Sequence, residues 1–134
     1  MRFELLEHTA DIMVRAHGEN LEECFANAAY ALFDQMTDVS TVRPLEEISF
    51  QACGHDYESL LYNFLSEFLY FHDAKRLLLS EFTVTFDGMA LQCVAKGERF
   101  DLKRHPQRHE VKAITYHMLE VDPQEPSLTV IFDI

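Results

Sequence analysis

The stretch Phe82-Thr83-Val84-Thr85-Phe86-Asp87-Gly88 decides the fold class of this sequence. Aromatic and β-branched residues alternate with threonines, which is typical of a half-buried strand, and Asp87-Gly88 is a dipeptide that two-residue hairpin turns favour. Residues 89–95 then return as a second, antiparallel strand. A hairpin here favours an α+β protein, because a doubly wound parallel sheet would need a helical crossover between the two strands.

Two segments carry the spacing of amphipathic helices. The first opens at Asn20, an N-cap residue followed three positions later by Glu23, and we expect it to end near Gln35. The second has Asp56 as its N-cap and an apolar stripe that ends at Phe71. The other predicted strands cover residues 3–7, 12–17, 48–52, 111–119 and 128–134. The expected fold is therefore a single α+β domain over 1–134, with two helices packed on a largely antiparallel or mixed β-sheet.

The composition is that of a globular protein and excludes several functions. Acidic residues occupy the start of the chain, where a signal peptide needs an apolar core, and no stretch approaches the roughly 20 apolar residues of a membrane span. We therefore expect a cytoplasmic protein without membrane contact. No G-x-G-x-x-G or P-loop motif supports a built-in nucleotide site. Cys24, Cys53 and Cys93 are isolated, and we expect them to be reduced, buried small hydrophobes.

The charge of the chain is strongly acidic but uneven. The net charge of −12 argues against a free-standing nucleic-acid binder, because such affinity comes mainly from Lys and Arg at phosphates. Six of the 11 basic residues nevertheless lie between positions 96 and 112 against three acids, which gives this segment a charge of +3. An acidic body suits docking on a basic partner. The alternative is an ordinary acidic surface with solvated loops.

Two aspartates stand at the ends of apolar strands. Asp11 directly precedes Ile12, and Asp133 precedes Ile134, the last residue of the sequence, so that a side-chain carboxylate lies beside the α-carboxylate. If the first and last strands lie close together, Asp11, Asp133 and Ile134 form a cluster of hard oxygen donors suited to Ca²⁺, Mg²⁺ or Mn²⁺. The alternative is that the two aspartates are separate surface acids.

Lys112 is a further candidate for chemistry. In an extended strand it points to the same side as Ile114, Tyr116 and Met118. On that mostly apolar face the ammonium group must form an ion pair or extend to an opening in the protein surface, because an unpaired buried charge is costly. The alternative is an edge lysine whose methylene stem packs while its charge reaches solvent.

Three other residues are candidates to orient the carboxylates. His8 and His117 lie near the aspartates and Lys112 in sequence, and either can hydrogen-bond a carboxylate. None of the seven histidines has the H-E-x-x-H spacing of a helical zinc pair. Glu67 is an acidic residue beside phenylalanines in the second predicted helix. The alternative to an orienting role is that Glu67 lies on the solvent-exposed flank of this amphipathic helix.

Several segments together resemble the archease family. The segments are His8-Thr9-Ala10-Asp11-Ile12, 25–33, Met36-Thr37-Asp38, 60–70, Lys96-Gly97-Glu98, Val111-Lys112-Ala113-Ile114-Thr115-Tyr116-His117 and Asp133-Ile134. They stand in the same order and at compatible spacings, and they cover most of the chain. Departures from the family pattern fall at Leu61-Tyr62-Asn63-Phe64, at Glu67-Phe68 and in the short loop 122–126, and none of them touches the proposed metal ligands.

The resemblance implies a protein cofactor rather than an enzyme. Its partner would be an RtcB-type RNA ligase, which uses GTP to join 2′,3′-cyclic phosphate or 3′-phosphate ends to 5′-hydroxyl ends in tRNA splicing or RNA repair. The family member promotes guanylylation of the ligase and allows multiple turnover, and RNA is contacted only through the ligase. The resemblance implies that Asp11, Asp133 and Ile134 bind a divalent metal ion, with Ca²⁺ preferred over Mg²⁺ or Mn²⁺, and that Lys112 is needed for activation.

Two other functions remain open on the residues alone. An independent metal-dependent hydrolase of phosphate esters would use the same carboxylates, although no strong general base accompanies them. A chaperone-like or RNA-modification accessory protein would need no metal.

Overall fold

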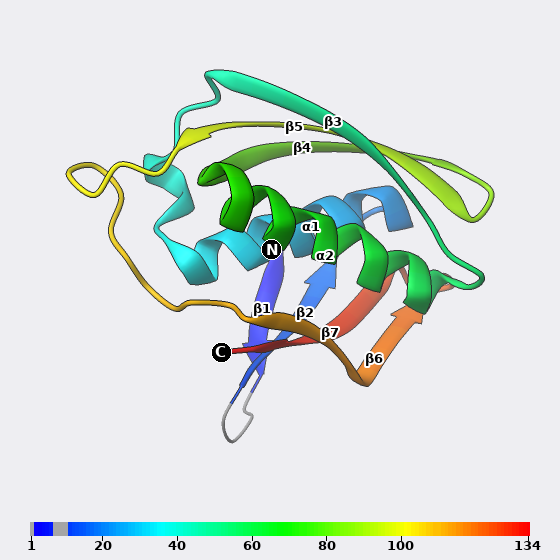
Figure 1. Ribbon diagram of the computed structural model, residues 1–134. Helices are drawn as coiled ribbons and strands as arrows, with labels where there is room; N and C mark the ends of the chain where they lie inside the picture. The colour runs from blue at the N-terminus through cyan, green and yellow to red at the C-terminus, as the bar shows by residue number, and fades with distance from the viewer. Residues whose placement is uncertain (1, 7–10) are drawn as a thin grey trace.

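Two antiparallel sheets enclose a layer of two helices in the computed structural model, which describes residues 2–6 and 11–134 (Figure 1). Sheet A has the order β1 (Phe3–Leu6), β2 (Ile12–His17), β7 (Ser127–Asp133), β6 (Ala113–Asp122). Sheet B has the order β3 (Glu46–Cys53), β5 (Ala90–Arg99), β4 (Leu77–Asp87). The helices are α1 (Leu21–Met36) and α2 (Tyr57–Lys75), and a 3-10 turn, η1, covers Val39–Thr41. The predicted α+β class with two helices is confirmed.

Each helix packs against both sheets. α1 contacts β4 and β2, and α2 contacts β6 and β3. The hydrophobic core therefore lies on both sides of the helix layer, between the helices and each sheet. Phe33 of α1 and Phe68 of α2 are fully buried and meet edge to face, with ring centroids 5.6 Å apart. Phe50 of β3 meets Phe68 in the same way at 5.2 Å. The phenylalanine-rich sequence thus supplies large, rigid core side chains where three elements converge.

The helix starts follow the predicted caps. Asn20 accepts a hydrogen bond on Oδ1 from the N–H of Glu23 at 2.8 Å. Asp56 accepts one from the N–H of Ser59 at 2.7 Å, while the Ser59 hydroxyl oxygen accepts the N–H of Asp56. These bonds satisfy amide groups that have no partner within the helix. Both starts were predictable because the caps are local.

The β4–β5 turn lies one residue later than predicted. Asp87 pairs with Ala90, so the two turn residues are Gly88 and Met89 rather than Asp87 and Gly88. Gly88 has φ +61°, and Met89 is not among the residues with positive φ. A type II′ turn needs positive φ only at its first central residue, which explains how a methionine can occupy the second.

The strands of sheet B extend further than the sequence pattern indicated. β4 begins at Leu77, where three consecutive leucines are buried and no polar alternation marks a strand. β5 continues through Gly97 to Arg99, beyond the predicted end of this strand at residue 95. Gly97 is required there, because a Cβ atom would overlap the carbonyl oxygen of Leu78.

The cysteines differ in their surroundings. Cys24 and Cys93 are buried, and burial raises the pKa of their thiols to about 11 and about 12. Cys53 is exposed at the end of β3, so the prediction of burial is wrong for this residue. All three are free thiols.

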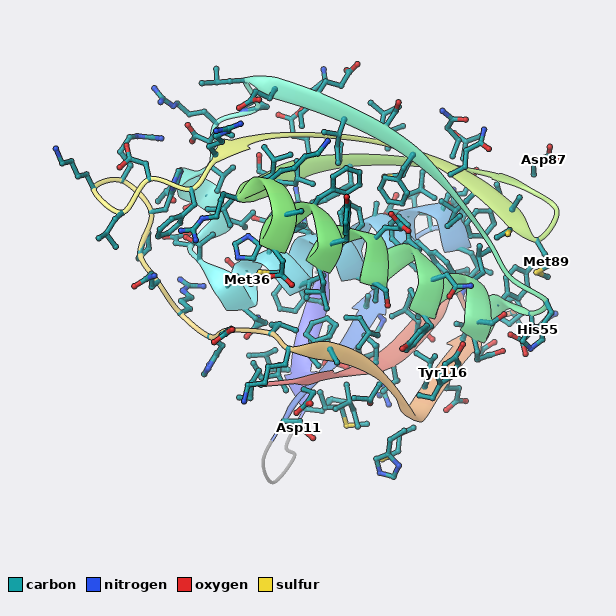
Figure 2. All side chains as sticks on the ribbon, in the orientation of Figure 1. Asp11, Met36, His55, Asp87, Met89 and Tyr116 are labelled. Carbon is teal, nitrogen blue, oxygen red and sulfur yellow. The ribbon has the colours of Figure 1, made fainter. Side chains whose placement is uncertain are left out.

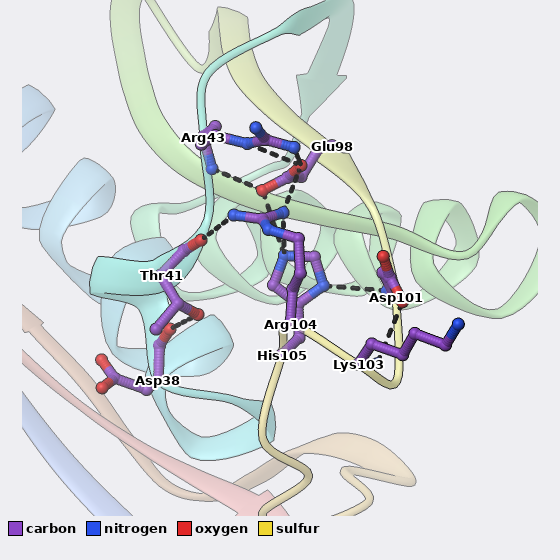
Figure 3. A network of polar contacts seen from close by, with 8 residues as sticks. All are labelled: Asp38, Thr41, Arg43, Glu98, Asp101, Lys103, Arg104 and His105. Atoms are coloured by element: carbon purple, nitrogen blue, oxygen red, sulfur yellow. Dashed lines mark hydrogen bonds and ion pairs between the residues drawn. The ribbon is translucent and has the colours of Figure 1, made fainter.

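A buried carboxylate anchors the connection between the two sheets (Figure 3). The side chain of Glu98, in β5, is only 8% exposed. It accepts hydrogen bonds from the Arg104 guanidinium at 2.8 Å and from the N–H of Arg43 at 2.7 Å, and the Arg43 guanidinium adds a bond at 3.2 Å. Burial alone would raise the pKa of Glu98, but the bonds from Arg104, Arg43 and His105 outweigh it and hold the pKa at about 2.

His105 completes this network as a neutral ring. Its Nδ1 accepts the N–H of Asp101 at 2.8 Å, so the ring proton is on Nε2, which lies 3.0 Å from Glu98 and donates to it. His105 is 1% exposed, and its bonds to Glu98 and Asp101 hold the ring inside the fold.

The same connection caps the end of α1. The N–H groups of Arg108 and His109 donate to the carbonyl oxygens of Met36 and Gln35 at 3.0 and 2.8 Å. The Arg108 guanidinium donates to the carbonyl oxygen of Asp34 at 2.7 Å. Helix ends leave such carbonyls unpaired, and a cation there is favourable. Part of the basic segment 96–112 is therefore used inside the fold, and it carries the chain from sheet B to Lys112.

Replacing the buried carboxylate tests this anchor. Glu98→Gln should lower the free energy of unfolding by about 3 kcal/mol, because Arg43 and Arg104 lose the charge that faces them. Urea unfolding at pH 7 measures the loss, and Glu125→Gln, in an exposed turn, should change stability by less than about 0.5 kcal/mol.

The pH dependence provides a second readout of the same variant. A carboxylate with a lowered pKa stabilises the fold fully above its ordinary value of 4.5, and this stabilisation is lost as pH falls towards about 2. Wild-type protein should therefore lose more stability than Glu98→Gln over that interval. Equal losses would contradict the role assigned to Glu98.

Candidate functional site

The pairing of β2 with β7 places the two candidate aspartates opposite each other. Ile12 pairs with Phe132 in the antiparallel register, and continuing that register by one residue sets Asp11 across from Asp133. On its other side, Asp133 pairs with Ala113 of β6. Asp11 thus lies at the end of sheet A beside the last strand (Figure 2). We call the group Asp11, Lys112, Asp133 and Ile134 the tip.

Strand alternation sets the direction of these carboxylates. Val14, Val130 and Phe132 point into the core and are fully buried. Asp11 and Asp133 are an odd number of positions away from them, so both lie on the outer face of sheet A, away from the helices. Directly opposed residues have Cβ atoms about 4.5–5.5 Å apart, which brings two carboxylates within reach of one cation.

Lys112 is joined to the tip through its backbone. Its N–H donates to the carbonyl oxygen of Asp133 at 2.7 Å, and its side chain is exposed. β6 begins one residue later, at Ala113. The structure therefore brings Lys112 to the same end of sheet A as Asp11 and Asp133.

The predicted apolar face around Lys112 is only partly present. Ile114 is buried, but Tyr116 and Met118 are each 54% exposed. The pairing of β6 with β7 shifts between Thr115 and Glu120, so regular alternation from Lys112 stops before Tyr116. The prediction of one continuous face through residue 118 is wrong for this reason.

The chemistry of the tip is that of hard oxygen donors. Within residues 2–6 and 11–134, neither aspartate nor Lys112 forms an ion pair within 4.0 Å. In the same residues no group of three or more His, Cys, Asp or Glu side chains is placed to hold a metal. Two opposed side-chain carboxylates are hard oxygen donors, the type that Ca²⁺ prefers, although they supply fewer than its six to eight oxygens.

The remaining candidates are placed differently. His8 lies outside the described residues. His117 is exposed in the irregular part of β6. Glu67 is exposed on α2, one turn after Asn63, whose side chain donates to the carbonyl oxygen of Cys53 in sheet B. The helix layer therefore separates Glu67 from sheet A, and the structure does not bring it to the tip.

One aromatic contact between α2 and β6 could not be predicted from the sequence. The rings of Tyr62 in α2 and Tyr116 in β6 stack with centroids 4.3 Å apart and planes 15° from parallel. The two residues are 54 positions apart in the chain. Local periodicity carries no information about such a pair.

The chain is similar to proteins of one family along almost its whole length. The model of the Archease protein family matches residues 3–134. The protein archease of Sulfurisphaera tokodaii is 44% identical over 123 residues, which are 90% of this chain and 88% of that protein. The protein archease of Pyrococcus furiosus is 44% identical over 125 residues, with the same coverage.

Solved structures agree with this result. The solution structure of Methanobacterium thermoautotrophicum protein 1598 superposes with a TM-score of 0.85 at 39% identity, covering 99% of both chains. The crystal structure of an archease, described as a possible chaperone, from Thermotoga maritima gives a TM-score of 0.65 at 22% identity, with 96% of this chain and 94% of that one covered, and so shows the fold alone. The chain belongs to the archease family. Among the described helices, none has the length and apolar character needed to cross a membrane.

A double-mutant cycle tests the opposition of the two aspartates. Like charges directly opposite each other destabilise a sheet, so Asp11→Asn and Asp133→Asn should each raise stability slightly in the presence of a chelator. Together they should gain less than the sum of the single changes, by about 0.2–1 kcal/mol. Urea unfolding measures the cycle. A coupling indistinguishable from zero would mean that the carboxylates do not face each other.

Proposed function

We propose that this protein is a cofactor of an RtcB-type RNA ligase and is not itself an enzyme. It promotes guanylylation of the ligase and so permits multiple turnover in tRNA splicing or RNA repair. Membership of the archease family supports this role. The observation that carries it is that Asp11, Asp133 and Lys112 lie at the same end of sheet A.

The tip is proposed to bind a divalent cation. Asp11, Asp133 and the Ile134 carboxylate would be its ligands, with Ca²⁺ preferred and Mg²⁺ or Mn²⁺ as alternatives. A bound cation would supply positive charge for phosphate oxygens. Because the protein supplies fewer than six oxygens, the other positions are open to water or to groups of the ligase complex. His117 and His8 stay candidates for orienting the carboxylates.

Lys112 supplies the fixed positive charge of the tip. Its backbone holds the last strand through the bond to Asp133, while its exposed side chain is available to a phosphate or to the carboxylates. Removing the side chain leaves the backbone bond in place. Lys112 therefore acts through charge, and its replacement tests function separately from folding.

The acidic character of the protein fits a basic partner. A net charge of −12 favours association with a ligase whose surface binds RNA phosphates, and it disfavours direct RNA binding. The RNA is then contacted only through the ligase. We propose that the protein performs this role in the cytoplasm.

A ligation assay tests the proposal. Adding the protein to an RtcB-type ligase, GTP and RNA with 3′-phosphate and 5′-hydroxyl ends should convert a single turnover into many turnovers. Lys112→Ala should abolish the increase, whereas Lys103→Ala, an exposed lysine earlier in the same connection, should leave it unchanged. Hydrolysis of GTP or RNA by the purified protein alone would favour the hydrolase instead.

Calorimetric titration with Ca²⁺ tests the metal site. The isolated protein should bind with modest affinity, because its oxygen shell is incomplete. Asp11→Asn and Asp133→Asn should each weaken binding at least tenfold, as should residues appended after Ile134. Asp73→Asn, an exposed acid at the end of α2, is the matched control and should bind as wild type does. Unchanged binding in both tip variants would remove the site.

A further inference from the structure

The irregular part of β6 exposes large side chains beside α2. Tyr116 and Met118 are each 54% exposed, and Tyr116 stacks on the half-buried Tyr62. Figure 2 shows Tyr116 below α2, at the side of the molecule that carries sheet A. We call Tyr62, Tyr116 and Met118 the aromatic patch.

The backbone under this patch is strained. Met118 has φ +57°, in the left-handed region that favours glycine, and regular pairing with β7 resumes only at Glu120. Thr115 Oγ1 is buried without a hydrogen-bond partner in the described structure. A regular strand would avoid the positive φ of Met118, so this part of the irregularity has a cost in stability. Strain of this kind is characteristic of functional segments.

We infer that the aromatic patch is the surface through which this protein docks on the ligase, an inference that rests on the proposed function. Tyrosine is enriched among the residues that dominate binding energy in protein interfaces, and methionine adapts its shape to a partner. The stack with Tyr62 fixes the Tyr116 ring before binding, so little side-chain freedom is lost on docking.

The patch is continuous with the tip. Lys112 immediately precedes β6, and Tyr116 lies four residues further, about 13 Å along an extended chain. A standard interface buries about 800 Å² on each partner, which corresponds to a face roughly 30 Å across. A footprint of this width is large enough to include both Lys112 and the aromatic patch. The patch supplies affinity, and the tip supplies the effect on the reaction.

The charges around the patch select the partner. Glu58 lies one turn before Tyr62 and accepts the N–H of Val121, and Glu120 and Asp122 follow Met118 in β6. An acidic rim repels RNA phosphates and a second copy of the same surface. It fits a protein with an apolar pocket ringed by Lys and Arg, and an enzyme that holds RNA presents such basic surface near its site.

The experiment measures activation of the ligase against the concentration of this protein. Tyr116→Ala should require at least tenfold more protein for half-maximal activation and reach the wild-type maximum at saturation. Tyr70→Ala is the matched control, because Tyr70 is 59% exposed on α2, and it should follow the wild-type curve. Lys112→Ala should show the opposite pattern, competing with wild type for the ligase without activating it.

A second variant protects the test against misfolding. Met118→Gly removes the side chain and relieves the positive φ, so its thermal stability should equal or exceed that of wild type while its half-maximal concentration rises at least fivefold. A variant that becomes more stable and docks less well cannot be explained by a damaged fold.

Three results would overturn the inference while leaving the proposed function intact. The first is a half-maximal concentration of Tyr116→Ala equal to that of wild type. The second is a lowered maximum for Tyr116→Ala at an unchanged half-maximal concentration. The third is that wild type binds single-stranded RNA or self-associates and that Tyr116→Ala abolishes this binding. A wild-type protein that neither binds nor activates the ligase would refute the proposed function and the inference with it.

Discussion

The buried carboxylate of Glu98 determines where the candidate site can form. It holds Arg43, Arg104 and His105 around one charge, and these residues come from two separate parts of the chain. The connection between the sheets is fixed here and again at the end of α1. From these two anchors the chain reaches Lys112 with little freedom. The charge of Glu98, which lies in sheet B, thus helps to position Lys112 beside sheet A.

Local features made much of the fold predictable. The caps at Asn20 and Asp56 lie next to the helices they specify, so both helix starts were placed to the residue, whereas α2 runs four residues beyond the apolar stripe that ends at Phe71. Failures came where one specific contact, rather than the periodicity of a segment, decides the outcome. The burial of His105 depends on Glu98 and Asp101, and the extension of β5 depends on the passage of β4 over Gly97.

The candidate site was predictable in its chemistry but not in its geometry. The sequence contains carboxylates and a lysine at strand ends, and their residue types indicate hard-cation chemistry. Only the pairing of β7 between β2 and β6 makes Asp11 and Asp133 neighbours. The same architecture puts the helix layer between Glu67 and sheet A. The irregular backbone near Met118 does not correspond to any periodic pattern in the sequence, so it could not be predicted.

The central place of β7 in sheet A has a consequence for biosynthesis. β2 pairs with a strand more than 100 positions later, so sheet A has a high contact order and its closure is expected to be slow. A ribosome must complete β7 before β1–β2 and β6 can join. Sheet B and the helices contain no residue beyond Arg99 and can assemble earlier on the nascent chain. The tip therefore arises last, which prevents an unfinished chain from presenting it to a partner.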